Sequence, residues 1–465
     1  MAKKTKPLFH DAPVMSYPYV KNRLLIIDWA SLSYHQFFSI GSDKNREKYG
    51  LLDSDGELAL WRNKMMGRVL HYITLFNPNH VIFALEGKAA WRRDFVKEYY
   101  AEHTTVYWNS KAFYVESDNY TYEVMKTTDG SDGYSISRVP VKNYDIFKNL
   151  KHRKLSEFDS AHKDMFWNLY TASGVPVIPS YKGTRKNKPW KFVVDRHLWM
   201  DYKDTFAKEL APLFRARAIK CPVAEGDDVI YASVMKYAAD SDDVIVVTGD
   251  SDMSQIDVKG VRIFNHRTDT FVDEPNPGKY LDMKVLAGDT SDNINGMAFI
   301  DPKTGKMKFT NGNQIGMGSD GSGGTAAKLM EACPDIYRTA CDNGWADQYM
   351  RNRKLIDLSM VPSDVKKVIN EAVSVPEPPL MQYPDFEAWD ITDMYRTTIQ
   401  RMQGIGFYCM QHEQAIKDNP NIFNRQLMEQ ADNRERIAQQ KSRGGWDGLD
   451  SSFVGTDLGD IDVIF

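Results

Sequence analysis

Short apolar runs alternate with segments of helical periodicity in the part of the chain before about residue 270. The runs are RLLIID (23–28), HVIFALE (80–86), DDVIVVTGD (242–250) and VRIFNH (261–266). Residues 58–76 and the segment EGDDVIYASVMKYAA place their apolar positions at the spacing of a helix. This alternation predicts an α/β fold with a largely parallel central sheet and helices on both faces.

Acidic residues stand at the carboxyl ends of three predicted strands. Asp28, Glu86 and Asp250 each close their own apolar run. Parallel strands end at one edge of a sheet, and ligands of open α/β sheets bind at that edge. We therefore expect these three carboxylates to lie close together.

Composition changes divide the chain into regions. Residues 104–175 are rich in Tyr, Ser, Asp and Asn, and predict an insertion of extra strands or loops with one helix. After residue 296 helical patterns dominate, and the chain finally turns polar, Gly-rich and acidic-hydrophobic. The predicted regions are an N-terminal arm (1–22), an α/β domain (23–295) with the insertion and a basic segment (180–220), a helical domain (296–429) and a flexible tail (430–465).

The bulk composition is that of an ordinary globular protein. Of 465 residues, 42% are hydrophobic and 26% are charged. No apolar run approaches the roughly 18 residues of a membrane span, and no secretory signal is visible at the N-terminus. The four cysteines show no metal-ligand spacing and favour a reducing interior. We expect a cytoplasmic protein with no membrane partner.

The charge is unevenly distributed. A net charge of −4 argues weakly against a simple binder of nucleic acid. Residues 182–220, however, contain eleven Lys or Arg and four Asp or Glu, and open with YKGTRKNKPWK. Such a stretch is either a solvated helix surface or a local face that holds phosphates.

Three motifs concentrate carboxylates. They are EGDDV (Glu225, Asp227, Asp228), GDSD (Asp250, Asp252) and GDTSD (Asp289, Asp292). Taken singly, each is explained by a turn or a helix start, with GDTSD placed at a loop-to-helix junction. Taken together with the acids at the strand ends, they would repel one another unless cations lay among them.

The donor set indicates which cation to expect. Carboxylate oxygens suit Mg²⁺ or Mn²⁺, and no His or Cys accompanies them at the spacing of zinc ligands. Two such ions about 3.5–4 Å apart can clamp the attacking and leaving oxygens of a phosphodiester. The residues therefore predict a centre for two Mg²⁺ (or Mn²⁺) ions.

The motifs also follow the order of a known family. IIDWAS, LEGKAAWRRDF, YKGTRK, EGDDVI, TGDSD and GDTSDNI together resemble the 5′-nuclease (flap endonuclease) superfamily. WRRDF and the segment NRKLIDLSMVPSDVKKVINEAV are similar to its T-even phage RNase H group. The resemblance covers about residues 23–103 and 175–410, and implies a fold of the PIN and flap endonuclease type.

The resemblance implies two groups of metal ligands. The first comprises Asp28, Glu86, Glu225 and Asp227. The second, acting directly or through water, comprises Asp228, Asp250, Asp252, Asp289 and Asp292. The family normally has Asp at the position of Glu86, and the longer side chain puts the geometry of the first site in question.

The resemblance also assigns roles to basic residues and to a Gly-rich segment. Arg92, Lys182 and Arg185 resemble residues that meet the scissile phosphate, although the insertion separates their motifs. Residues 314–332 resemble a helix–turn–helix hairpin that binds duplex DNA and often a monovalent cation; a flexible linker is the alternative. The expected DNA contacts are Arg93, Lys186, Lys188, Gly316, Gly318 and Lys328.

The end of the chain contains acidic and apolar residues. It is either a tail without function or a tethered peptide that binds an apolar pocket. Such peptides are similar to ends that bind a sliding clamp or that belong to single-strand-binding proteins. The expected anchors are Ile461, Val463, Ile464 and Phe465.

The resemblance implies a monomeric, metal-dependent 5′→3′ exonuclease and flap endonuclease. Its substrates would be branched or nicked DNA and RNA–DNA duplexes, with RNase H activity and removal of RNA primers or flaps during phage DNA replication in the cytoplasm of an infected bacterium. Two alternatives remain: a non-catalytic protein that binds junctions, and a PIN-like ribonuclease acting on single-stranded RNA.

Overall fold

The structure is a computed structural model, and it describes most of the chain before residue 379. The described residues are 20, 22–41, 52–116, 121–127, 133–139, 145, 147–183, 190–272, 274, 276–300, 307–309 and 335–378. Several predicted features therefore lie outside the described residues. They are the N-terminal arm up to residue 19, Arg185, Lys186, Lys188, the hairpin segment 314–332 with Gly316, Gly318 and Lys328, and the tail with Ile461, Val463, Ile464 and Phe465.

A six-stranded sheet forms the centre of the molecule, in the order β11-β10-β9-β1-β2-β8. Its strands are β1 Arg23–Asp28, β2 His80–Leu85, β8 Arg217–Lys220, β9 Asp243–Thr248, β10 Val261–Asn265 and β11 Thr270–Phe271. All neighbouring strands are parallel except β10 and β11. The central strand β1 is buried along its whole length, as expected for a sheet covered on both faces.

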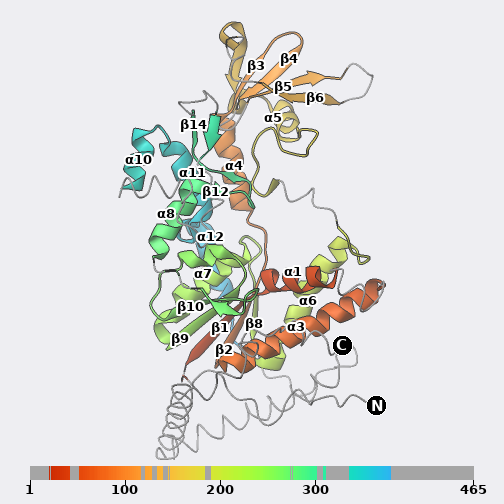
Figure 1. The fold of residues 1–465 in the computed structure, drawn as a ribbon, viewed down its shortest axis with the longest axis vertical. Coiled ribbons are helices and arrows are strands. Elements are labelled where there is room, and N and C mark those ends of the chain that lie inside the picture. Colours follow the sequence, from red (N-terminus) through yellow and green to blue (C-terminus); the bar gives the residue numbers. More distant parts are fainter. Residues whose placement is uncertain are drawn as a thin grey trace, which may run out of the picture.

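Helices cover both faces of this sheet (Figure 1). One face packs on α1 Trp29–Ile40, α3 Ser54–Phe76 and α6 Arg196–Leu210, with η4 Ala211–Phe214 after α6. The other packs on α7 Gly226–Tyr237, followed by η5 Ala238–Asp240, and on α12 Ser363–Ala372. The predicted fold class is thus confirmed for the α/β part. No helix among the described residues is long and apolar enough to cross a membrane.

The insertion forms a separate antiparallel sheet at the far end of α4 Ala90–His103 (Figure 1). Its order is β6-β5-β4-β3-β7. The elements are β3 Thr105–Trp108, β4 Ala112–Glu116, β5 Thr121–Lys126, β6 Tyr134–Arg138, β7 Lys151–Lys154, η2 Leu155–Glu157 and α5 Ser160–Trp167. Extra strands with one helix agree with the sequence pattern.

Helices and short strands make up the described chain after residue 276. They are α8 Pro277–Ala287, β12 Gly288–Asp289, β13 Ile294–Asn295, β14 Ala298–Ile300, β15 Met307–Phe309, α10 Ile336–Asp342, α11 Ala346–Ile356 and η7 Leu358–Met360. Residues of α8, α10 and α11 share one hydrophobic cluster with α4 and the insertion. The domain boundaries at 295 and 429 stay predictions.

One local expectation was wrong. The motif GDTSD does not begin a helix; it follows α8 and forms the turn between the paired strands β12 and β13. The N–H of Ser291 donates to Asp289 Oδ1 at 2.8 Å, which closes an Asx turn. Asp favours such turns as much as helix starts, so the motif alone could not distinguish them.

Candidate metal centre

The predicted strand-end acids do lie at the carboxyl edge of the central sheet. Asp28 caps α1, accepting the N–H of Ser31 at 3.0 Å and the hydroxyl of Thr248 at 2.7 Å. Glu86 follows β2, and its Oε2 accepts the N–H of Gly226 at 3.0 Å. Its extra methylene lets it reach the first residue of α7. Each acid therefore has a local structural role as well as a place in the cluster.

Asp250 follows β9 and caps the short helix η6 Ser251–Gln255. Its Oδ1 accepts the N–H of Asp252 at 3.0 Å. Asp250 is exposed, whereas Asp252 is half-buried. The turn interpretation of GDSD is therefore correct as local structure, and it does not prevent the carboxylates from facing a shared site.

Four carboxylates of the cluster have no ion-pair partner among the described residues: Asp28, Glu86, Asp227 and Asp250. Burial raises the pKa of Asp28 to about 7, and the charges of Asp250 and Glu86 add to this effect. Burial and the same neighbours raise the pKa of Asp227 well above its ordinary value. Burial also raises the pKa of Glu86. We call these four residues the unpaired acids.

The other acids of the cluster are paired with cations, the first of which is Arg92. Its guanidinium binds both oxygens of Asp228, at 2.7 and 2.6 Å, and lies 3.3 Å from Glu225. Its Nε donates to the carbonyl of Leu355 at 3.3 Å, and the residue is only 1% exposed. Arg92 is thus buried as a link between α4, α7 and α11. The expected contact of Arg92 with the scissile phosphate stays a prediction. Arg93, which is expected to contact DNA, is exposed, and its role also stays a prediction.

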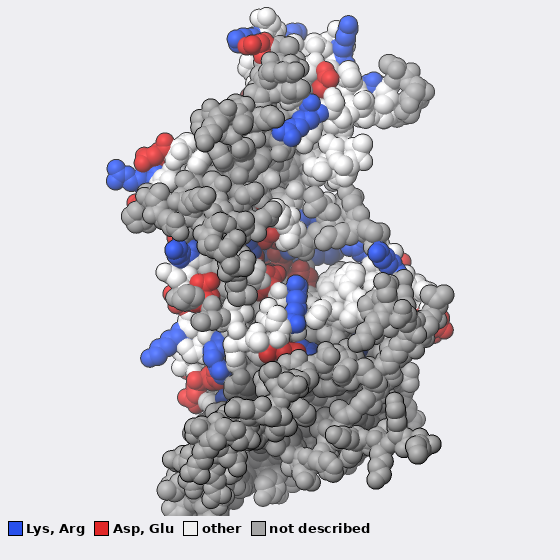
Figure 2. Space-filling view, in the orientation of Figure 1, with Lys and Arg blue, Asp and Glu red and all other residues white. Residues whose placement is uncertain are grey.

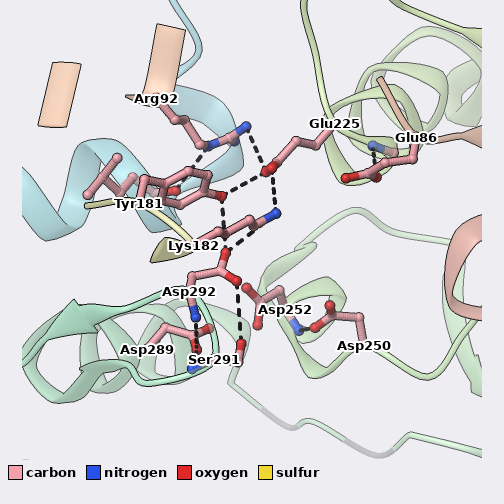
Figure 3. Close-up of polar contacts among 12 residues, drawn as sticks. Glu86, Arg92, Tyr181, Lys182, Glu225, Asp250, Asp252, Asp289, Ser291 and Asp292 are labelled. Carbon is pink, nitrogen blue, oxygen red and sulfur yellow. Dashed lines mark hydrogen bonds and ion pairs between the residues drawn. The ribbon is translucent and has the colours of Figure 1, made fainter. Parts of the chain in front are cut away.

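A second cation, Lys182, joins the EGDDV and GDTSD motifs (Figure 3). Its ammonium contacts Glu225 and lies 3.7 Å from Asp292 Oδ2. Lys182 has φ of 56°, in the left-handed region, and its N–H donates to the carbonyl of Asp292 at 2.8 Å. Burial alone would raise the pKa of Glu225, but Lys182 and Arg92 lower it.

Two further residues of the centre were missed in the sequence. The hydroxyl of Tyr181 lies 2.8 Å from Glu225 Oε2 and 3.0 Å from Asp292 Oδ2. Lys284 of α8 contacts Asp252 and lies 3.1 Å from Asp289 Oδ2. Both residues are close in sequence to the motifs, because Tyr181 directly precedes Lys182 and Lys284 lies shortly before GDTSD. Their acidic partners come from other parts of the chain, which the local pattern does not reveal.

The chemistry of the donor set fits a hard divalent cation. Acidic side chains gather in the middle of the molecule, with Lys and Arg around them (Figure 2). Within the described ranges, no three Asp, Glu, His or Cys side chains converge closely enough to form a ready-made metal cage. The unpaired acids nevertheless offer only oxygen ligands and carry uncompensated charge, which a cation would relieve. The fold and site thus define an α/β protein with a candidate divalent-cation centre at the carboxyl edge of its sheet.

Comparison with known sequences supports the family resemblance. The chain is 29% identical over 164 residues to DNA polymerase I of Streptococcus pneumoniae, a match covering 32% of this chain and 18% of that protein. It is 22% identical over 220 residues to a 5′-3′ exonuclease of Buchnera aphidicola, covering 43% of this chain and 69% of that protein. No family model matches. The matches confirm the resemblance to the 5′-nuclease superfamily, because the chain is similar to a 5′-3′ exonuclease and to part of DNA polymerase I.

The match to DNA polymerase I involves less than a fifth of that protein's length. Among solved structures, the T5 5′-exonuclease with bound divalent zinc ions aligns at a TM-score of 0.38 and 13% identity, covering 76% of this chain and 98% of that chain. A T5 flap endonuclease in complex with DNA and metal ions aligns with the same TM-score and identity.

Proposed function

We propose that this protein is a metal-dependent 5′ nuclease that hydrolyses phosphodiesters near the 5′ ends or flaps of DNA. The observation that carries the proposal is the set of unpaired acids at the carboxyl edge of the sheet. Burial and neighbouring carboxylates raise the pKa values of Asp28, Glu86 and Asp227, and buried negative charge of this kind is costly in a folded protein unless it serves a cation. The sequence relatedness to 5′-3′ exonucleases supports nuclease chemistry for that cation.

In this proposal Asp28, Glu86, Asp227 and Asp250 hold one Mg²⁺ or Mn²⁺. When bound, such an ion would stabilise negative charge on the phosphoryl oxygens and would lower the pKa of a water bound to it towards neutrality. The paired acids Asp252, Asp289 and Asp292 serve a second ion, directly or through water. Lys284 contacts Asp252 and Asp289 and offsets part of their charge when no metal ion is bound.

The cations of the centre have different tasks. Lys182 is half-buried and lies at the rim, where its ammonium can meet the oxygens of a phosphoryl group and stabilise charge that develops there. Arg92 and Asp228 form a buried pair that fixes the start of α7, and with it Glu225 and Asp227. We therefore assign Asp228 a positioning role, because both of its oxygens are bound to Arg92.

The finer parts of the proposal rest on the resemblance. The substrates would include RNA–DNA hybrids and RNA primers during phage replication. Residues 314–332 would bind duplex DNA together with a monovalent cation, and the tail would bind a sliding clamp or a single-strand-binding protein. The protein would be a monomer in the cytoplasm of the infected bacterium. Contacts of Arg185, Lys186 and Lys188 with the phosphates of the substrate belong to the same part of the proposal.

Cleavage of a 5′-labelled flap duplex tests the proposal. Wild type and Asp250→Asn are compared in Mg²⁺, Mn²⁺ and EDTA, with single-stranded RNA as a competitor. We expect metal-dependent release of 5′ fragments by wild type only, with little competition by RNA. Tight flap binding without cleavage would indicate a junction-binding protein, and preferential cleavage of the RNA would indicate a PIN-like ribonuclease.

A further inference from the structure

A second group of polar side chains lies beside the unpaired acids and has no part in the proposed metal centre. The hydroxyl of Ser31, three residues after Asp28, lies 2.9 Å from Nε2 of His266. The same hydroxyl accepts the N–H of Gly249 at 3.2 Å. The ring of His35, on α1, lies with its centroid 5.1 Å from that of His266. These contacts place two imidazoles directly next to the end of β9.

Gly249 shows how closely this group approaches the acids. A Cβ atom at this position would lie 2.6 Å from Nε of Arg267 and 2.8 Å from Nε2 of His266. Any larger residue would push the guanidinium or the imidazole away. Arg267 therefore lies against the residue that immediately precedes Asp250, at the same carboxyl edge of the sheet.

The group has one exposed cation and two buried nitrogen atoms that lack a hydrogen-bond partner among the described residues. Arg267 is exposed and has no ion pair with any described residue. His266 is only 1% exposed, and the buried Nδ1 atoms of His266 and His35 have no hydrogen-bond partner in the described part of the chain. Burial, with the charges of Arg267, Arg68 and Lys64, lowers the pKa of His35. Burial, with the charges of His35 and Arg267, lowers the pKa of His266 to about 3, so both imidazoles are neutral at pH 7.

The other cations nearby are less exposed than Arg267. Arg68 forms an ion pair with Asp269 at 2.5 Å and donates to the carbonyl of His266 at 2.9 Å, which fixes the turn after β10. Lys64, on α3, is 5% exposed. The exposed guanidinium of Arg267 is thus the cation best placed to meet a ligand from solvent.

We propose that Arg267, with His35 and His266 behind it, binds a phosphodiester of the substrate strand next to the one that is cleaved. Guanidinium groups bind phosphate oxygens through two parallel hydrogen bonds. The Nδ1 atoms of both imidazoles are buried and Nε2 of His266 contacts Ser31, so the rings help to position Arg267 and do not contact the phosphate. Phosphate contacts fix the register of a nucleic acid on a protein. A fixed neighbouring phosphate would place the scissile bond against the carboxylates. This inference rests on the proposed nuclease function.

A double-mutant cycle tests the assignment by combining the variant Arg267→Gln with DNA in which one phosphate is replaced by an uncharged group. Flap duplexes carry one methylphosphonate at each of the positions around the cut, and binding is measured in EDTA. For wild type we expect a loss of about tenfold at one position or two adjacent positions, as for one charge-assisted contact. Arg267→Gln should bind the unmodified duplex about tenfold more weakly and show no further loss at those positions.

Matched variants separate a phosphate contact from a structural role. Arg153→Gln removes an exposed arginine from β7 of the insertion, and we expect the wild-type position pattern to persist. Arg267→Lys should recover part of the affinity at the same position. If Arg267→Gln lost the same affinity for every modified duplex and also had a lower melting temperature, Arg267 would have a structural role and the inference would be overturned.

Two further outcomes are informative. Arg267→Gln and a methylphosphonate are coupled when their combined loss of affinity is smaller than the sum of the two separate losses. Coupling that occurs only in duplexes with a 5′-terminal phosphate, and not in duplexes with a 5′-hydroxyl, would overturn the assignment to an internal phosphodiester. No coupling at any position, in a wild-type protein that cleaves the flap, would refute this inference but leave the nuclease function intact. A wild type that binds the flap and does not cleave it would instead contradict the proposed function.

Discussion

The raised pKa of Asp28 makes a quantitative prediction for the metal-free protein. Its pKa is about 7 in the folded state against an ordinary value of 3.8. Between these values the folded state binds more protons than the unfolded state, so the free energy of unfolding falls as the pH rises. The rise of the Asp28 pKa from 3.8 to about 7 corresponds to about 4 kcal/mol of lost stability, fully expressed above pH 7. Asp28 therefore destabilises the protein at neutral pH when no cation is bound.

Replacement of Asp28 by Asn should remove this cost. Asn caps helices as well as Asp does, so its oxygen can still accept the N–H of Ser31. We expect Asp28→Asn without metal to exceed wild type in free energy of unfolding by up to about 4 kcal/mol at pH 8. The difference should shrink by about 1.4 kcal/mol per pH unit below pH 7, and vanish near pH 4.

Urea denaturation at pH 5 and pH 8 in EDTA measures this difference. Asp195→Asn is the matched control, because Asp195 also caps a helix but is exposed, and its hydrogen bonds lower its pKa. The control should gain no stability at pH 8. Equal stability of Asp28→Asn and wild type at pH 8, or a difference that does not depend on pH, would refute the reasoning.

Three other substitutions test contacts around the centre. Arg92→Gln leaves Asp228 buried without its partner and should lower the free energy of unfolding by about 3–5 kcal/mol in urea denaturation; an unchanged value would contradict a buried ion pair. Tyr181→Phe removes a hydroxyl shared by two carboxylates and should cost about 1.5–3 kcal/mol in the same assay, so full retention of stability would count against it. Gly87→Ala places a Cβ 1.8 and 2.3 Å from two carbonyl oxygens of the loop before α7, and should lower both melting temperature and cleavage; wild-type values would show that the loop can yield.

The sequence predicted much of the central sheet because its strands are apolar runs that end in acids. Strand β8 was missed, since RAIK (217–220) is short and two of its four residues are basic. Arg217 is nevertheless buried there and donates to the hydroxyl of Tyr237 at 2.6 Å. A contact of this kind joins separate elements, so a local pattern does not show it.

The acids of the site were predicted from their positions, but their pairing was not. Nothing in the letters EGDDV indicates that Asp228 is held by Arg92 while Asp227 has no cation among the described residues. That distinction depends on which basic residues reach the site from α4, α8 and the loop at Lys182. It also changes which acids are the better candidates for metal ligands.

Divalent-cation binding by the unpaired acids is the central claim, and calorimetric titration of the metal-free protein with Mn²⁺ tests it most directly. We expect saturable binding to wild type and to the control Asp195→Asn, and at least tenfold weaker binding to Asp227→Asn, which loses one unpaired carboxylate. Wild-type affinity in Asp227→Asn would contradict the claim that these acids form the metal centre.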